Sequence, residues 1–192
     1  NKLDIDLDYL IDLTKVNFDM SDLQLFLKER IINYLTEKNY QKKIVEAVVK
    51  YHKLDFLPIL PRVIAEITEF ISSESGVRFL AIYKRVSNLL SSNKELVTYK
   101  RKFSKERATK EDKILQKQLT LIKEQLEESL QHKDFKKALL ILESMVNPVN
   151  QFLDNVQVNC EDQELRNLRY SLLSQISETM DSVVVFSEFD KK

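Results

Sequence analysis

The sequence predicts an all-α fold, a helical bundle of about seven to nine helices, and two observations lead to this prediction. The 192 residues include one glycine and three prolines, whereas β-rich folds need many turn residues with the backbone freedom of glycine. Apolar residues make up 43% of the chain. Over most of its length they recur at intervals of three and four residues, which is the spacing of a helix with one buried side.

In the first third of the chain we expect four helical segments. Residues 1–18 alternate aspartate with apolar residues and predict an acidic helix, interpreted as the remnant of a preceding domain. Residues 19–192 are expected to form one helical domain. Its first helix would be capped by Ser21 or Asp22. The apolar side of that helix is predicted to contain Leu23, Phe26, Leu27, Ile31 and Leu35. Helices over about 41–52 and 62–72 follow, separated by a break at Pro58 and Pro61.

The rest of the chain predicts further helices with recognisable starts. A helix over about 77–90 precedes a polar, basic stretch at about 91–112, which is interpreted as a loop or insertion. A long helix with a narrow apolar seam from Leu115 to Leu126 comes next, followed by a helix capped by Asp134. Asn147 with Pro148 predicts the start of a short helix. Asn159 is expected to cap the last long helix.

The charges are unevenly distributed, although 30 basic and 30 acidic side chains give the whole chain a net charge of zero. Residues 94–113 carry eight basic and four acidic side chains, whereas both ends of the chain are acidic. Within this stretch Lys100, Arg101 and Lys102 lie between Tyr99 and Phe103. Alternating basic and aromatic residues can bind phosphates and stack on bases. The alternative is a solvated insertion without a ligand.

The residue types that form self-contained catalytic sites are few. A single glycine excludes a glycine-rich phosphate loop, and His52 and His132 are each followed by lysine, with no cysteine or histidine at metal-ligand spacing. We therefore expect no catalytic site, metal or cofactor in this chain. Cys160 is the only cysteine, which favours a reducing, cytoplasmic location. No apolar run is long enough for a membrane span, and no signal peptide is visible. The start at Asn1 is interpreted as that of a fragment.

Two motifs together resemble a known family. The first is Lys84-Arg85-Val86-Ser87-Asn88-Leu89-Leu90. The second begins Pro148-Val149-Asn150-Gln151-Phe152-Leu153-Asp154-Asn155-Val156 and continues to Arg166, Arg169 and Leu172-Leu173. In this order they resemble the C-terminal domain of the β subunit of bacterial glycyl-tRNA synthetases. Tyr83, Asn150 and Leu168 depart from the pattern of that family.

The resemblance implies a helical bundle of the DALR anticodon-binding type and glycine tRNA as the partner. It also implies that the parent protein works with a separate α subunit, which activates glycine with ATP and Mg²⁺. Neither DNA nor a membrane is an expected partner. On this basis the parent is a glycine–tRNA ligase, whereas the chain itself holds tRNA and carries out no chemistry.

The candidate tRNA-binding residues each have a structural alternative. Lys84 and Asn88 are one helical turn apart and are expected to face solvent or RNA. Arg85 either contacts RNA or pairs with Asp154 or another carboxylate. Arg169 lies within the apolar arc of the last helix, so an ion pair competes with an RNA contact.

Two further candidates lie near the second motif. Arg166 lies closer to the edge of the apolar arc of its helix and is the better RNA candidate of the two arginines there. Asn155 either reads a base edge or braces its own helix. A rival interpretation of the whole chain is a helical protein–protein interaction module without RNA binding. In that case the Leu115–Leu126 seam would take a partner helix.

Overall fold

A computed structural model describes residues 20–52, 59–93 and 106–189. These residues form eight α-helices, one 3₁₀-helix and no strand, which confirms the predicted all-α class. The chain divides into two compact units. Unit 1 comprises residues 1–69 and 184–192, and unit 2 comprises residues 70–183. The predicted helix at 1–18 and the candidates Lys100, Arg101 and Lys102 lie outside the described residues.

Unit 1 contains α2 (Met20–Glu37), α3 (Lys42–Tyr51), most of α4 (Leu60–Ser72) and the 3₁₀-helix η2 (Phe186–Phe189). The turn between α2 and α3 places Asn39 in the left-handed region at φ 67°, a conformation that asparagine tolerates better than most residues. α3 packs against α2 and η2. Its buried side consists of Ile44, Val45, Ala47, Val48 and Val49.

The first helix differs from its prediction in two ways. Ser21 and Asp22 lie inside α2 and do not cap it, because the helix already begins at Met20. Of the five residues predicted for its buried side, Leu35 alone is buried, while Phe26 is 51% exposed. The regular spacing identified a helix correctly, but spacing alone does not determine how much of an apolar side is covered.

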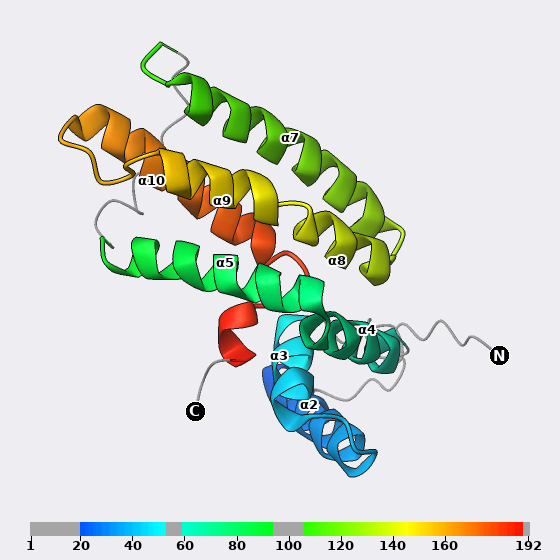
Figure 1. Cartoon of the computed structure of the whole chain (residues 1–192). Helices are drawn as coiled ribbons and strands as arrows, with labels where there is room; N and C mark the ends of the chain where they lie inside the picture. Colours follow the sequence, from blue (N-terminus) through cyan, green and yellow to red (C-terminus); the bar gives the residue numbers. More distant parts are fainter. Residues whose placement is uncertain (1–19, 53–58, 94–105, 190–192) are drawn as a thin grey trace. The chain divides into compact units, whose positions relative to one another are not determined.

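Unit 2 contains α5 (Glu74–Ser91), α7 (Lys110–Gln131), α8 (Phe135–Glu143), α9 (Val146–Asn155) and α10 (Gln163–Met180). Figure 1 shows α5 and α7 on opposite sides of α9 and α10. α7 and α10 run in the same direction, while α5 runs in the opposite one. The C-terminal ends of α5 and α9 and the N-terminal ends of α7 and α10 lie at the same end of unit 2 (Figure 1). We call this end the convergent end.

The starts of two helices in unit 2, α7 and α9, correct the sequence interpretation, and the start of α8 confirms it. The stretch predicted as a loop to residue 112 ends earlier, because Thr109 and Asp112 form a capping box that begins α7 at Lys110. Asn147 is not a cap: α9 begins at Val146, with Pro148 inside the first turn. Proline is tolerated there because the first-turn N–H groups have no partner within the helix. Asp134 caps α8 as predicted, with its carboxylate accepting from Lys137 N.

The last long helix is capped by Asp162 and not by Asn159. Asp162 Oδ1 accepts hydrogen bonds from the N–H groups of Glu164 and Leu165, at 2.9 and 3.1 Å. Both residue types make good caps. The chain from Val156 to Asp162 is not helical, so α10 begins only after Asp162. Asp162, which directly precedes the helix, therefore caps it, and Asn159 lies too early in the chain to do so.

The apolar seam of α7 is part of the core of unit 2. Leu115, Leu119, Ile122 and Leu126 are all buried, with at most 8% of each residue exposed. α7 packs against α8, α9 and α10. The surface that the rival interpretation reserved for a partner helix is therefore occupied by helices of the same unit.

The junction between α4 and α5 depends on Gly76, the only glycine of the chain. Ser73 alone separates the two helices and caps α5, accepting a hydrogen bond from Gly76 N at 3.0 Å. This turn brings Gly76 against the backbone of Phe70. A Cβ atom at residue 76 would overlap the carbonyl oxygen of Phe70 and lie 2.6 Å from its carbonyl carbon. Since the neighbouring atoms are backbone, they cannot move aside as a side chain would.

We expect Gly76→Ala to lower the free energy of unfolding by at least about 2 kcal/mol, because the added methyl group forces the backbone of α4 and α5 apart. Urea unfolding followed by circular dichroism measures this change. Val77→Ala is the matched control, since Val77 is 58% exposed on the same helix. Equal stability of the two variants would contradict the packing described for the junction.

Among the described residues, no helix combines the length and the apolar character that crossing a membrane requires.

Candidate nucleic-acid interface

The convergent end of unit 2 gathers most of the described candidate residues. Three side-chain contacts hold its helices together. Arg169 of α10 reaches Asp112 at the start of α7, with 3.1 Å between Nε and Oδ1. Asn93, just after α5, donates to the hydroxyl of Tyr170 on α10 at 2.6 Å. Arg85 of α5 reaches Asp154 of α9 at 2.7 Å. The two sequence motifs, which lie far apart in the chain, therefore meet in space.

Arg169 is a buried structural residue. Its side chain is 7% exposed, and that of Asp112 is 0% exposed. Besides the ion pair with Asp112, Arg169 donates from Nη1 to the carbonyl oxygen of Gln157 at 2.8 Å. A buried arginine needs such partners, because an unpaired charge in the protein interior is strongly unfavourable. Of the two alternatives for Arg169, the structure favours the ion pair.

Arg85 also forms the ion pair that the sequence suggested, but at the surface. Its Nη1 lies 3.0 Å from Asn150 Oδ1 and 2.7 Å from Asp154 Oδ1, and its Nη2 donates to the carbonyl oxygen of Leu153 at 3.2 Å. The side chains of Arg85 and Asp154 are 42% and 51% exposed. Arg85 thus joins α5 to α9 while one side of its guanidinium group stays accessible.

Lys84 and Asn88 are exposed on the outer side of α5, one turn apart, as predicted. They flank Arg85 in the sequence and point away from the buried side formed by Phe79, Tyr83 and Val86. These two side chains are therefore the best placed on α5 to reach a ligand in solvent.

Arg166 and Asn155 differ in how accessible their polar atoms are to a ligand. Arg166 is half-buried, with Nη1 donating weakly to the carbonyl oxygen of Cys160 at 3.5 Å. Its Nε is buried and has no hydrogen-bond partner among the described residues. Asn155 is exposed, and its amide donates to the carbonyl oxygen of Gln151 at 2.7 Å. Asn155 thus braces its own helix, while its amide oxygen remains an acceptor.

The sequence interpretation missed a set of interactions around the cap of α10. Arg107 lies 3.6 Å from Asp162 and 3.0 Å from Glu164. The N–H of Leu165 is the largest cause of a lowered pKa at Asp162; burial opposes this shift, while the N–H of Glu164 and the charges of Arg107 and Arg169 add to it. Arg107 was interpreted as one more cation of the basic stretch, because no sequence signal links it to an acid more than fifty residues later.

The described part of the convergent end carries charges of both signs. Lys110 and Glu111 begin α7, Glu164 and Arg166 lie in the first turn of α10, and Lys84 precedes Arg85 on α5. Lys100, Arg101 and Lys102 stand between Asn93 and Glu106 in the sequence and lie outside the described residues. Among the described residues there is no group of His, Cys, Asp and Glu that fits a metal ion. The arrangement offers cations and amide groups for RNA.

Comparison with known proteins agrees with this geometry. Residues 79–184, more than half of the chain and most of unit 2, match the DALR anticodon binding domain. Over 97% of its length the chain is 29% identical to the glycine–tRNA ligase β subunit of Rickettsia typhi and 31% identical to that of Rickettsia africae. It is also 29% identical to the β subunit of a Janthinobacterium strain. The chain spans 28%, 28% and 27% of the lengths of these three relatives.

The two arginine pairs should differ widely in their effect on stability. We expect Arg169→Met to lower the free energy of unfolding by about 3–5 kcal/mol, because it leaves the Asp112 carboxylate buried without its partner. Arg85→Met should lower it by less than about 1 kcal/mol, because that pair is solvated. Urea unfolding of both variants at neutral pH measures the difference. Similar losses for the two variants would show that burial does not separate their roles.

Proposed function

The chain belongs to the DALR anticodon binding domain family, and from that premise we propose that it recognises the anticodon of glycine tRNA. The proposal treats the chain as the C-terminal part of a glycine–tRNA ligase β subunit. The observation that carries it is the convergent end of unit 2, where both motifs meet within the matched range of residues. The names of the relatives, glycine–tRNA ligase β subunits, support the choice of glycine tRNA.

The proposed mechanism separates affinity from selectivity. Lys84 and Arg166 at the convergent end would bind phosphates, and so would Lys100, Arg101 and Lys102, which lie outside the described residues. Phosphate contacts orient the RNA but carry no sequence information. Selectivity would come from Asn88, Asn155 and the accessible side of Arg85, which present amide and guanidinium groups to the edges of unstacked bases. Arg169 would support this surface from inside through Asp112 and Gln157.

The parent enzyme supplies the chemistry in this proposal. The ATP- and Mg²⁺-dependent activation of glycine takes place on a separate α subunit, and the present chain contributes tRNA binding in the cytoplasm. The shortage of catalytic residue types in the sequence supports this division of work. A mixture of this chain with an isolated α subunit is therefore expected to restore no glycylation of tRNA. Efficient charging by that mixture, measured with radiolabelled glycine, would disprove the division.

Binding of glycine tRNA to the chain tests the proposal directly. We expect binding to weaken steeply between low and moderate salt, because displaced counterions drive the association. Lys84→Ala and Arg166→Ala should each weaken binding about three- to tenfold, a typical loss for one phosphate contact of this kind. Asn88→Ala should reduce the preference for the native anticodon over a substituted one. Fluorescence anisotropy with labelled tRNA measures all three effects.

Lys136→Ala is the matched control for these variants. Lys136 is exposed on α8, away from the convergent end, so its removal should leave the affinity unchanged. Equal binding of tRNAs with native and substituted anticodons would reduce the proposal to a general basic surface. Loss of affinity in Lys136→Ala to the same extent as in Lys84→Ala would show that the convergent end is not the binding face.

A further inference from the structure

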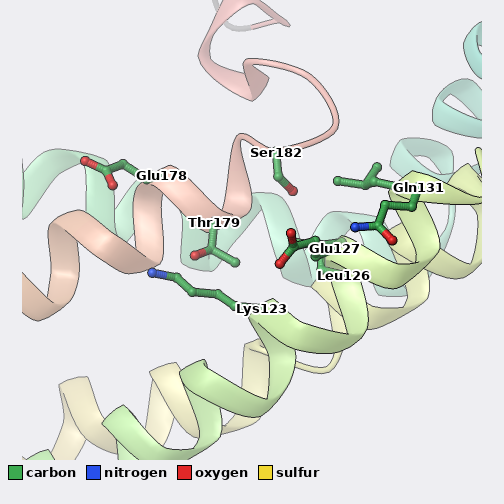
Figure 2. A pocket seen from close by; sticks show the side chains of 8 residues that line it. Lys123, Leu126, Glu127, Gln131, Glu178, Thr179 and Ser182 are labelled. Carbon is green, nitrogen blue, oxygen red and sulfur yellow. The ribbon is translucent and has the colours of Figure 1, made fainter.

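A second surface of unit 2 lies away from the convergent end. It is an open groove of about 480 Å³ between the C-terminal halves of α7 and α10. Figure 2 shows how side chains from both helices and from the segment after α10 surround it. Its floor is formed by Leu126 and Leu130, the last apolar residues of the α7 seam. Leu126 is buried and Leu130 is half-buried, so the apolar core of unit 2 becomes accessible to solvent here.

One end of the groove offers mainly hydrogen-bond acceptors. Ser182 Oγ is buried and has no hydrogen-bond partner among the described residues. In Figure 2 the side chain of Ser182 points toward those of Glu127 and Gln131. Between this end and Lys123, Thr179 donates its hydroxyl proton to the carbonyl oxygen of Gln175 at 2.7 Å, which leaves its oxygen free to accept. A ligand rich in N–H donors would satisfy these groups.

The other end of the groove already holds a cation. Lys123 lies beside Thr179 in Figure 2, and its Nζ is 3.5 Å from Gln175 Oε1. Partial burial lowers the pKa of Lys123, and the nearby carboxylate of Glu178 opposes this shift. Lys123 and Glu178 thus both lie toward this end, whereas Glu127 lies at the end with Ser182 and Gln131. The negative charge available to a ligand is therefore that of Glu127.

The backbone adds to the negative character of this region. α7 and α10 both end here, and neither helix has a basic residue in its last turn. The C-terminal end of a helix carries a partial negative charge. In the sequence Glu124 and Glu128 precede the end of α7 and Asp181 follows α10, while Lys133 lies two residues beyond α7.

We propose that this groove binds an arginine side chain of a partner protein. The guanidinium group has five N–H donors and no acceptor, which matches Glu127, Ser182 Oγ, Thr179 Oγ1 and the amide oxygen of Gln131. Its aliphatic stem would cover Leu126 and Leu130, as arginine stems commonly cover apolar surface. Lys123 closes the far end to a second cation. The charge of the groove selects a basic protein segment over an acidic or nucleic-acid ligand.

Nuclear magnetic resonance of the full ¹⁵N-labelled chain tests the proposal. The probe is the capped tripeptide Ala-Arg-Leu, and the comparison peptide carries citrulline, which has the shape of arginine without its charge. We expect the arginine peptide to shift the amide resonances of Leu130, Gln131, Thr179 and Ser182. Its dissociation constant should be on the order of 1 mM, as befits one anchored side chain. The citrulline peptide should bind at least about fivefold more weakly.

Three variants separate the groove from a general charge effect. Glu127→Gln should weaken binding of the arginine peptide about fivefold, whereas Lys123→Gln should strengthen it, because a neighbouring cation is removed. Glu111→Gln is the matched control, since it removes one exposed carboxylate at the other end of α7 and should change nothing. Three outcomes would each overturn the proposal: equal binding of the two peptides, resonance shifts outside the groove, or no shifts at a peptide concentration ten times the expected dissociation constant. So would shifts of the groove amides on addition of tRNA.

Discussion

The buried ion pair between Arg169 and Asp112 is the interaction on which the convergent end of unit 2 depends. Both carboxylate oxygens of Asp112 accept hydrogen bonds: Oδ1 accepts from Arg169, while Oδ2 accepts from the backbone N–H and the hydroxyl of Thr109. Arg169 in turn holds the carbonyl oxygen of Gln157. One pair therefore fixes the start of α7, the first half of α10 and the segment between α9 and α10. Because both charges are buried, losing either partner leaves the other uncompensated.

This constraint determines what the surface of that end can present. With α10 fixed against α7, Tyr170 is in place to receive Asn93, and the end of α5 is held beside α10. Arg85 then joins α5 to α9 from the outer side. Lys84, Asn88 and Arg166 are not needed for these joints and lie on elements that the joints hold still. Polar side chains on a rigidly supported surface are the arrangement that a binding site requires.

The sequence predicted the helices better than the contacts between them. The pairing of Arg85 with Asp154 was among its alternatives, because both residues belong to recognisable motifs and opposite charges seek each other. Asp112 was not identified as the partner of Arg169, because it lies in a stretch that reads as polar and basic and 57 residues separate the two. The cap of α10 was misplaced because Asn159 and Asp162 are chemically equivalent as caps, and only the path of the chain after α9 distinguishes them. Likewise, spacing could not show that Phe26 would be exposed.

The direction of the helices explains why unit 2 has two surfaces with opposite preferences. α7 and α10 are parallel, so their N-terminal ends lie together at the convergent end and their C-terminal ends lie together at the groove. Helix dipoles favour anions at the first end and cations at the second. At the helix starts, Lys110 and Arg166 stand together with Glu111, Asp112 and Glu164, so charges of both signs are present there. Near the helix ends, Glu127, Glu128 and Glu178 add acidic groups. Under the two proposals made above, RNA binds at one end of the unit and a basic protein segment at the other, so the two ligands do not compete for one surface.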